Sequence, residues 1–522
     1  MRRNVDMLHK PGFRLQDLLF YHTFVVNDIF ILPFKGIRIM PFESLGEYIE
    51  ALDKAGQLKR VKTRVSANLE IAEIMRRLMY YKDQPAVLFE NVQDSTMPIL
   101  GNAFGTLQRL QIAMDSQNFS EIGERIVELT RMKIPSGILN KLRLLPKFSE
   151  IAEYGPKYVD SGPVTQIIEK ENASLNSLPV LKSFVGDAGK FITLGLTVTK
   201  HPETGIRNIG VYRIQLIDER KAIMHWQIHK RGAQHYEIMK AANKPIEVAV
   251  IIGADPATVF SGVAPVPEGL DKFLFSGIAR KKGTKLVKCS TVNLEVPANA
   301  EMVLEGYVDP NDIRTEGPFG DHTGYYTPPE PYPTFTLTAI MRRRDPIYLT
   351  TVVGKPILED AYIGKVIERS FLPLLQIFQP EVVDFSMPPS GWFQGLAVIS
   401  IRKRFPGQAK KVMMALWGMG QLSLTKIFVV VDSDINIHNI DEVLWAITTR
   451  ADPKRDTMII DNAPTDTLDP ASSLPNLGSK MGIDATTKWR EEGYTREMQH
   501  LATVDEGTAT LVNNKWKEYG FL

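Results

Sequence analysis

The sequence has only one cysteine, Cys289, among its 522 residues. An internal disulfide and a CxxC metal knuckle are therefore excluded, and the composition fits a reducing compartment. Cys289 lies within the apolar stretch 286–292, which favours a place in the core over a role as a nucleophile.

An excess of charge of either sign is also missing. The chain has 62 Lys and Arg against 60 Asp and Glu, a net charge of +2, so it carries no electrostatic footprint for nucleic acid. No run approaches the roughly 18 uncharged apolar residues that a membrane-spanning helix requires. Partners must therefore be inferred from individual sites rather than from bulk charge.

The first 39 residues lack the pattern of a signal peptide and that of an anchor, because no small-residue cleavage site follows a compact apolar core. Their apolar stretch is interrupted by three polar residues: Asp17, His22 and Asp28. A clear start appears at Met40, where Ser44 and Glu47 have capping-box spacing ahead of an apolar helical stripe that ends at Gly56. We predict that the folded unit begins at Met40 and that residues 1–39 are an extension or a mis-assigned start.

What is present is an ordinary globular composition of 44% hydrophobic and 23% charged residues, in a chain long enough for about three domains. From 40 to 155, helices such as 71–80 alternate with short strands such as 86–89, which predicts an N-terminal α/β domain. A connector rich in Pro, Ser and Gly then leads into a central region, 156–345, and the remainder, 346–522, returns to an α/β pattern.

Short β-rich runs dominate the central region: 194–200, 209–217, 246–252, 286–292, 302–308 and 334–341. They lack regular helical spacers, so we predict a barrel or a sandwich rather than a doubly wound parallel sheet. In the last region, an apolar strand at 426–431, a capped helix from Asn439 to Arg450 and a strand at 457–460 form a βαβ pattern.

Three segments of the central region concentrate residues suited to chemistry: 208–213, 225–235 and 316–326. In the third segment, Glu316 and Asp321 flank a Gly-Pro-Phe-Gly turn that holds them in a fixed loop. Two carboxylates held this way can act as a general acid and its regulator, provided that a nearby cation such as Arg213 separates their pKa values. Taken alone, the same pattern also describes a solvated turn.

Five separated motifs, in one order, decide between these interpretations: Asn208-Ile-Gly-Val-Tyr-Arg213, Gly253-Ala-Asp-Pro-Ala-Thr258, Glu316-Gly-Pro-Phe-Gly-Asp321-His-Thr-Gly-Tyr-Tyr326, Trp445-Ala-Ile-Thr-Thr-Arg450 and Lys480-Met-Gly-Ile-Asp-Ala-Thr486. Together they resemble the UbiD family of decarboxylases from about Phe42 to Trp489. The resemblance implies a multi-domain α/β protein with an N-terminal α/β domain, a central split β-barrel that binds prenylated FMN, and a C-terminal α/β domain. In such an enzyme the cofactor supplies the electrophilic centre.

The resemblance also implies roles for individual residues. Arg213, Glu316 and Asp321 would form the catalytic triad, with Asp321 as the proton donor. The flavin would be contacted by Val211, Tyr212, Arg213, His225, Trp226, Gln227, Arg231 and Gly232, partly through backbone groups. In one regular strand Asn208 and Arg213 would point to opposite faces. Either Gly210 marks a bulge, or the two residues serve opposite sides.

The expected metal site is where the sequence departs from the family pattern. Mn2+ would bind the flavin phosphate through Asn208, His235 and a Glu, but Lys272 stands where that Glu is expected. Three interpretations stay open: Asp271 or Glu268 supplies the carboxylate, Lys272 contacts the phosphate directly, or the site is impaired. A K+ ion is a further cofactor that is compatible with the resemblance.

By this resemblance the substrate is an aromatic carboxylic acid. The preferred substrate is 3-polyprenyl-4-hydroxybenzoate, in ubiquinone or menaquinone biosynthesis, or a related 4-hydroxybenzoate-type acid. The alternative is that the protein is a non-catalytic or impaired flavin-binding member of the family. A flavin prenyltransferase would supply the cofactor. We expect a cytoplasmic homo-oligomer, a dimer or a hexamer, with at most peripheral membrane contact and no nucleic-acid partner.

Overall fold

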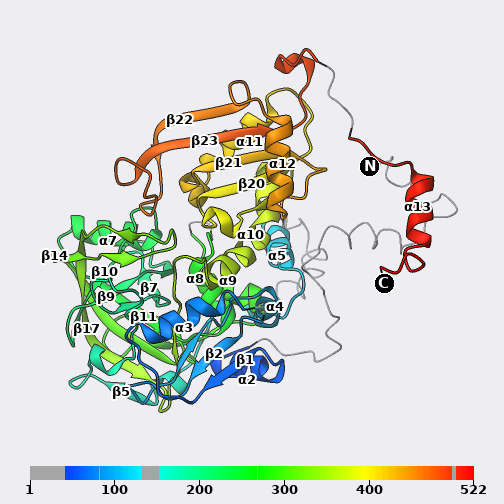
Figure 1. The fold of residues 1–522 in the computed structure, drawn as a ribbon. Coiled ribbons are helices and arrows are strands. Elements are labelled where there is room, and N and C mark those ends of the chain that lie inside the picture. Colours follow the sequence, from blue (N-terminus) through cyan, green and yellow to red (C-terminus); the bar gives the residue numbers. More distant parts are fainter. Residues whose placement is uncertain (1–41, 82, 132–151, 267–268, 497–500, 522) are drawn as a thin grey trace, which may run out of the picture.

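The computed structural model describes residues 42–81, 83–131, 152–266, 269–496 and 501–521 (Figure 1). The predicted start at Met40 and the predicted extension 1–39 lie outside these residues.

The first described helix, α2 (Leu45–Lys54), begins as its sequence predicts but with a shifted capping pair. Ser44 Oγ accepts a hydrogen bond from the Glu47 amide at 3.3 Å. The Glu47 carboxylate accepts a hydrogen bond from the Glu43 amide at 2.6 Å, one residue before the predicted partner, Ser44. The helix stops before Gly56, whose φ of +68° suits a residue without a side chain.

A four-stranded sheet forms the N-terminal layer, in the order β1 (Leu58–Val61), β2 (Ala86–Phe89), β3 (Ile99–Gly101) and β18 (Tyr348–Leu349). The accompanying helices are α3 (Glu70–Leu78), α4 (Leu107–Met114) and α5 (Ser120–Arg131). Because β18 pairs with β3 in parallel, the chain returns to this sheet after it has passed through the central one.

The central sheet is antiparallel throughout its described pairings. Its order is β6 (Phe191–Ile192), β9 (Ile214–Leu216), β10 (Lys221–Met224), β17 (Glu330–Arg342), β14 (Met302–Glu316), β11 (Ile246–Ile252), β7 (Leu196–Lys200) and β8 (Arg207–Val211), with β5 (Ile167–Glu169) beside β17. The longest strands, β14 and β17, pair along most of their length, and their register shifts twice.

The prediction of one strand over 209–217 is wrong, and its failure explains the shape of the sheet. The strand breaks at Tyr212 and Arg213, between β8 and β9. These two strands lie near opposite ends of the strand order, so a two-residue link can join them only if the sheet curls. The β7–β8 hairpin at one end of the strand order is therefore joined to β6 and β9 at the other end across the seam of a half-barrel. This confirms the barrel over the sandwich.

Helices and small sheets complete the central region: α7 (Arg231–Ala241), α8 (Pro256–Val263), α9 (Lys272–Arg280), a sheet of β13 (Glu295–Pro297), β12 (Lys285–Lys288) and β4 (Lys157–Tyr158), and a pair of β15 (Phe319–Gly320) and β16 (Tyr326–Thr327). Asp255 caps α8 through the Thr258 amide and pairs with Arg280 at 3.0 Å. The motif 253–258 is thus structural. Burial raises the pKa of the Cys289 thiol, which keeps it protonated.

The C-terminal region begins with the long helix α10 (Glu359–Phe378). A five-stranded sheet follows, in the order β19 (Val382–Ser386), β20 (Leu396–Ile401), β21 (Ile427–Asp432), β23 (Leu477–Ala485) and β22 (Thr457–Pro464), with α11 (Gln408–Trp417), α12 (Ile440–Arg450) and, further along the chain, α13 (Glu506–Asn514). Short 3-10 turns occur at Pro163–Thr165, Leu175–Ser177, Pro389–Gly391, Gly420–Leu424 and Arg490–Glu492.

The predicted βαβ unit over 426–460 is correct in its elements but wrong in its pairing. β21 is parallel to β23, and β22 pairs with β23 in the antiparallel sense. The strand after α12, β22, therefore lies at the edge of the sheet as one arm of a hairpin. The sequence pattern could not show that the following strand, β23, would lie beside β21.

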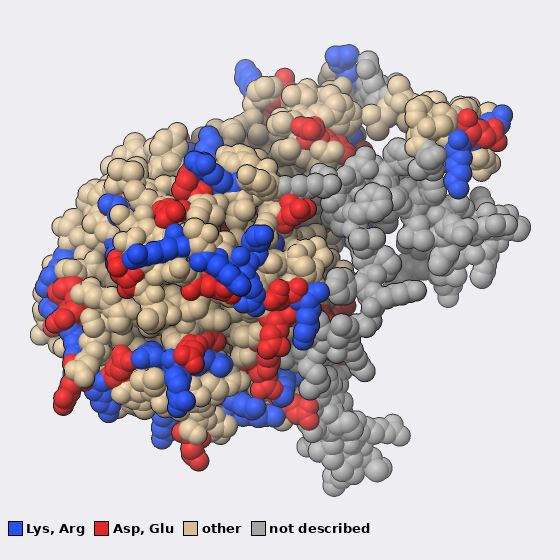
Figure 2. Space-filling model, turned by 60° about the horizontal axis from the view of Figure 1, so that its bottom comes forward, with Lys and Arg blue, Asp and Glu red and all other residues tan. Residues whose placement is uncertain are grey.

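The surface bears out the balanced composition. On the face that Figure 2 displays, Lys and Arg side chains are interspersed with Asp and Glu, without a continuous basic area. Among the residues that the structure describes, no helix combines the length and the apolar character needed to cross a bilayer.

Candidate active site

Arg213 and Glu316 form the centre of a buried polar cluster. Arg213 Nε and Nη2 donate to the two carboxylate oxygens of Glu316 at 2.8 and 2.9 Å, a bidentate pair. The Glu316 side chain is fully buried, and that of Arg213 is 9% exposed. Although burial alone would raise the pKa of Glu316, hydrogen bonds from His225 and Arg213 bring it down to about 2.

Asp321 completes this cluster from the other end of the Gly-Pro-Phe-Gly turn. Its Oδ2 accepts from Arg213 Nη1 at 2.6 Å, while Oδ1 accepts from the amide of His322 at 2.8 Å. Burial opposes ionisation, but the charges of His322 and Arg213 outweigh it and hold the pKa of Asp321 below its usual value. The resting carboxyl is therefore ionised at neutral pH.

Two residues that the sequence analysis missed hold this turn in place. Asp187, which is 3% exposed, accepts from the amides of Ser183, Phe184 and Gly320 at 2.8–3.1 Å. Gln215 Oε1 accepts from the Gly317 amide at 2.8 Å. No sequence spacing links these residues to the turn, since more than 100 residues separate each from its partner.

His225 also contacts Glu316, at the oxygen that Arg213 Nη2 binds. Its Nδ1 is 3.3 Å from Glu316 Oε2, and its ring packs on Tyr332 with centroids 4.3 Å apart. Burial and the charge of Arg213 lower the pKa of His225, so the imidazole is neutral at pH 7 and donates from Nδ1 to the carboxylate. The structure therefore joins Arg213, Glu316, Asp321 and His225 in one network.

The other aromatic side chains predicted near the cofactor pack against one another. Trp226 meets Tyr212 edge to face at 4.9 Å, and both are 3% exposed. The Gly232 amide donates to the Tyr212 hydroxyl at 2.9 Å, and a Cβ at Gly232 would lie 2.5 Å from that oxygen. The side chains of Tyr212 and Trp226 are thus engaged in packing, so these two residues would meet a ligand through their backbone.

A group of cations lies beside this segment. Lys230 Nζ donates to the Val211 carbonyl at 3.1 Å, Arg231 Nη2 to the Val266 carbonyl at 2.8 Å and Lys272 Nζ to the Gly262 carbonyl at 3.2 Å. Burial and the charges of Arg231 and Lys230 lower the pKa of Lys272 to about 7. Arg231 Nη1 is buried without a hydrogen-bond partner. Neighbouring cations satisfied by carbonyls, with one donor unused, suit an anion such as a phosphate group.

The predicted metal ligands lie in the interior of the protein. Asn208 and His235 are both 2% exposed, and His235 Nδ1 bonds to Thr199 Oγ1 at 2.9 Å. Asp271 instead caps α9 and pairs with Arg207 at 2.6 Å, while Glu268 lies outside the described residues. Within the described part of the chain, no group of three or more His, Cys, Asp or Glu side chains could hold a metal ion.

A hydrogen bond joins the site to the C-terminal region. Gln227 Nε2 lies 3.4 Å from Oδ1 of Asp466, which belongs to the loop between β22 and β23 and is 3% exposed. Burial lowers the pKa values of His229 and Lys230, and the negative charge of Asp466 offsets part of this lowering. The loop between β22 and β23 thus places a carboxylate beside Gln227, a residue predicted to contact the flavin.

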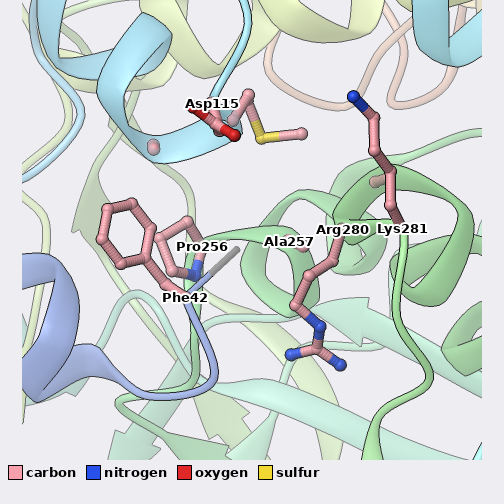
Figure 3. Close-up of a pocket in the computed structure, with 9 residues that line it drawn as sticks. Phe42, Asp115, Pro256, Ala257, Arg280 and Lys281 are labelled. Carbon is pink, nitrogen blue, oxygen red and sulfur yellow. The ribbon is translucent and has the colours of Figure 1, made fainter. Parts of the chain in front are cut away.

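Two other features contribute no side chain to this network. Tyr325 and Tyr326 are 65% and 49% exposed, so they do not enclose an aromatic pocket. A small cavity of about 30 Å³, between the ends of α4, α8 and α9, is lined by Phe42, Asp115, Pro256, Ala257, Arg280 and Lys281 among others (Figure 3). It has room for a water molecule and not for an aromatic acid.

Family models match most of the chain. The N-terminal, Rift-related and C-terminal domains of 3-octaprenyl-4-hydroxybenzoate carboxy-lyase match residues 49–129, 157–356 and 361–485. An uncharacterized protein of Archaeoglobus fulgidus is 48% identical over 481 residues, covering 92% of this chain and 99% of its own.

Solved structures agree with this assignment. The UbiD-class enzyme HmfF from Pelotomaculum thermopropionicum, in complex with FMN, is 29% identical with a TM-score of 0.76, over 92% of this chain and 100% of its own. The closed form of vanillic acid decarboxylase from Sedimentibacter hydroxybenzoicus is 29% identical with a TM-score of 0.81, over 92% of this chain and 99% of its own. The open form of that decarboxylase, over the same shares, scores 0.72. The domain arrangement is therefore nearer to the closed form.

Proposed function

The chain belongs to the UbiD family of carboxy-lyases, and from that premise we propose that it removes CO2 from an aromatic carboxylic acid of the 4-hydroxybenzoate type, using prenylated FMN. The observation that carries this proposal is the arrangement around Arg213, whose guanidinium binds Glu316 on two nitrogens and Asp321 on the third. A guanidinium fixed on both sides is already oriented before any substrate arrives.

In the proposed reaction each of these residues has a separate task. Glu316 fixes the plane of Arg213, and Arg213 Nη1 orients Oδ2 of Asp321. Asp321 delivers a proton to the carbon that CO2 has left, so the acid ends as an arene. His225 adds a second contact to Glu316 Oε2, which helps to fix the orientation of that carboxylate.

The cofactor supplies an electrophilic centre when it is bound. The backbone of 211–213 and 225–227, together with Arg231 and Gly232, would hold it. HmfF binds FMN, and an evolved dimeric form of HmfF binds prFMN, which supports the same cofactor here. A flavin prenyltransferase would supply the prenylated form.

We further propose that Lys272 replaces the metal ion in holding the cofactor phosphate. Of the two carboxylates that could replace the missing Glu, Asp271 is engaged with Arg207 and Glu268 lies outside the described residues. The charges of Lys230 and Arg231 act on Lys272, so a phosphate at this point would meet three cations. On this proposal neither Mn2+ nor K+ is required.

Lys272→Glu tests the phosphate contact. We expect this variant to lose FMN affinity by at least tenfold in the absence of metal, whereas Lys240→Glu, the same charge change at an exposed site on α7, leaves it unchanged. Titration with FMN, followed by fluorescence, measures both. Stoichiometric Mn2+ in the flavin-loaded wild type, or tighter flavin binding by Lys272→Glu, would contradict the direct contact.

The substrate proposed first is 3-polyprenyl-4-hydroxybenzoate, because the matching family models carry the description of a 3-octaprenyl-4-hydroxybenzoate carboxy-lyase. A place in ubiquinone or menaquinone biosynthesis would follow from that substrate, as would peripheral contact with a membrane. Smaller acids of this class, such as vanillate, are the alternative that the likeness to vanillic acid decarboxylase supports. A homo-oligomer stays a prediction.

Co-expression with a flavin prenyltransferase, followed by a panel of aryl acids, tests the activity. The loaded protein should release CO2 from 4-hydroxybenzoate-type acids. Asp321→Asn should abolish product formation and retain the cofactor, while Asp345→Asn, at an exposed position, should behave as wild type. A loaded protein that turns over none of the acids would contradict the proposal, as would an Asp321→Asn variant of full activity.

A further inference from the structure

His322 lies between two carboxylates, where the sequence alone gave it no clear role. Its Nδ1 is 2.5 Å from Oδ2 of Asp360, and its Nε2 is 3.7 Å from Oδ1 of Asp321. The side chain of His322 is 23% exposed, so the ring lies between the buried Asp321 and solvent.

Asp360 is held independently of His322. It is the second residue of α10, where the positive end of the helix dipole favours a carboxylate. Its Oδ1 accepts from the amide of Leu358 at 3.1 Å, which leaves Oδ2 for the imidazole. A His whose Nδ1–H is bound to a fixed carboxylate presents its Nε2 in a fixed direction.

The remaining groups around the ring come from other elements. Phe393 packs edge to face on it at 5.3 Å, and the charge of Asp466, from the C-terminal sheet, acts on it. Arg213 faces Asp321 from the opposite side, on Oδ2. The two oxygens of Asp321 thus have different neighbours: Arg213 at one, and the His322 amide and imidazole at the other.

Decarboxylation places a demand on this arrangement. A carboxylate that loses CO2 and ends as an arene takes up one proton per turnover. Asp321 is ionised at rest, so it must receive that proton from elsewhere before it can deliver it. Arg213 cannot supply the proton, because a guanidinium does not lose one in proteins.

We propose that His322, oriented by Asp360, supplies the proton that Asp321 delivers to the product. The Nε2–H bond of the imidazolium breaks and an O–H bond forms at Asp321 Oδ1. Asp321 then transfers that proton to the carbon that has lost CO2, and the neutral imidazole recovers a proton from solvent. The balance is one carboxylate and one proton consumed, with one arene and one CO2 formed. This inference rests on the proposed decarboxylation.

The pKa values of the two groups set their resting charges, and the transfer between them is uphill until the proton passes on to the carbon that has lost CO2. Although burial disfavours the charged imidazole, Asp321 and Asp360 raise the pKa of His322 to about 9. The ring is therefore protonated at neutral pH while Asp321 is ionised. At 3.7 Å, Nε2 is beyond hydrogen-bond distance of Oδ1, and such contacts commonly tighten when a substrate is bound.

The first test is an NMR titration of the full-length protein with labelled histidine, which requires neither cofactor nor turnover. His322, assigned by its loss in His322→Gln, should titrate near pH 9. Asp360→Asn should lower that midpoint by at least one pH unit. His438→Gln, at a second His–Asp pair with 2.9 Å between His438 and Asp384, should leave it unchanged. A midpoint at or below that of an ordinary histidine would overturn the proposal.

The second test uses the holoenzyme and the pH dependence of product formation. Wild-type kcat should fall as the pH rises through the His322 midpoint, and in Asp360→Asn the fall should begin at lower pH. His322→Gln should lower kcat by about a hundredfold and remove that limb, with KM changed less than threefold. An unchanged profile in His322→Gln contradicts the relay while leaving the decarboxylase assignment intact. Absence of turnover in the wild type contradicts the assignment and not the titration.

Discussion

Gln227 Nε2 lies 3.4 Å from Asp466 Oδ1, and this hydrogen bond connects the predicted flavin segment to the C-terminal sheet. From this contact we predict that Asp466 stabilises the arrangement in which the two regions are closed on each other. Asp466→Asn keeps the shape and removes the charge that acts on Lys230 and His322.

We expect Asp466→Asn to raise the substrate KM by about three- to tenfold, since a neutral hydrogen bond is worth roughly 1 kcal/mol less than a charged one. Small-angle scattering should detect a larger radius of gyration in this variant. Asp461→Asn, on the exposed side of β22, is the control. Equal radii for all three proteins would show that the contact does not hold the closed arrangement.

Arg213→Ala should destabilise the protein more than its loss of contacts suggests. It leaves the fully buried Glu316 carboxylate without its cation, which costs about 3–5 kcal/mol in the free energy of unfolding. Urea unfolding measures this change. Arg213→Lys keeps the charge without the two-pronged geometry, so it should recover part of the stability but less than a tenth of the activity.

Gly320 packs so closely against Phe184 that a side chain there has no room. A Cβ at Gly320 would lie 2.4 Å from the Phe184 ring. Gly320→Ala should therefore lower the free energy of unfolding by about 1–3 kcal/mol and displace Asp321, with a matching loss of activity. Phe184→Leu in the same chain should restore part of both. Strictly additive effects of the two substitutions would exclude this clash as the cause.

Glu359 is buried with Oε1 unpaired, while Oε2 accepts from the Phe104 amide at 2.9 Å. Burial raises its pKa to about 7. A carboxyl whose folded-state pKa is raised contributes stability below its unfolded pKa and loses it as the pH rises through 7.

Glu359→Gln should accordingly be more stable than the wild type at pH 8 by about 1–3 kcal/mol, and no more stable at pH 4. Thermal unfolding at both pH values measures the difference. Glu50→Gln, at a side chain that is 73% exposed, should show no such dependence. A Glu359→Gln variant that is less stable at pH 8 would mean that the ionised carboxylate has partners in solution.

The sequence predicted those elements whose signals are local. Strand β2 and the N-cap at Ser44 follow from residues close in the chain. The pairing of β22 could not be foreseen, because it depends on which strand takes the place beside β21. The break at Tyr212 and Arg213 was hidden within an apolar run that reads as a single strand.

The same division holds for the candidate site. Its motif residues are recognisable by type and order, and the structure brings Arg213, Glu316 and Asp321 together. Asp187 and Asp360 carry no such signal, since one lies in a connector and the other reads as an ordinary acid at a helix start. Their partners are fixed by tertiary contacts, so no spacing rule could have found them.

The bend between β8 and β9 also determines where the chain can tolerate insertions and deletions. Arg213 lies in a link of two residues. An insertion there would have two effects at once: it would move the guanidinium relative to Glu316, and it would reduce the curvature of the sheet. The turn from His201 to Ile206, which joins β7 and β8 into a hairpin at the other end of β8, does not carry Arg213. Variation among relatives in this hairpin should therefore collect at the turn, while the link keeps its length.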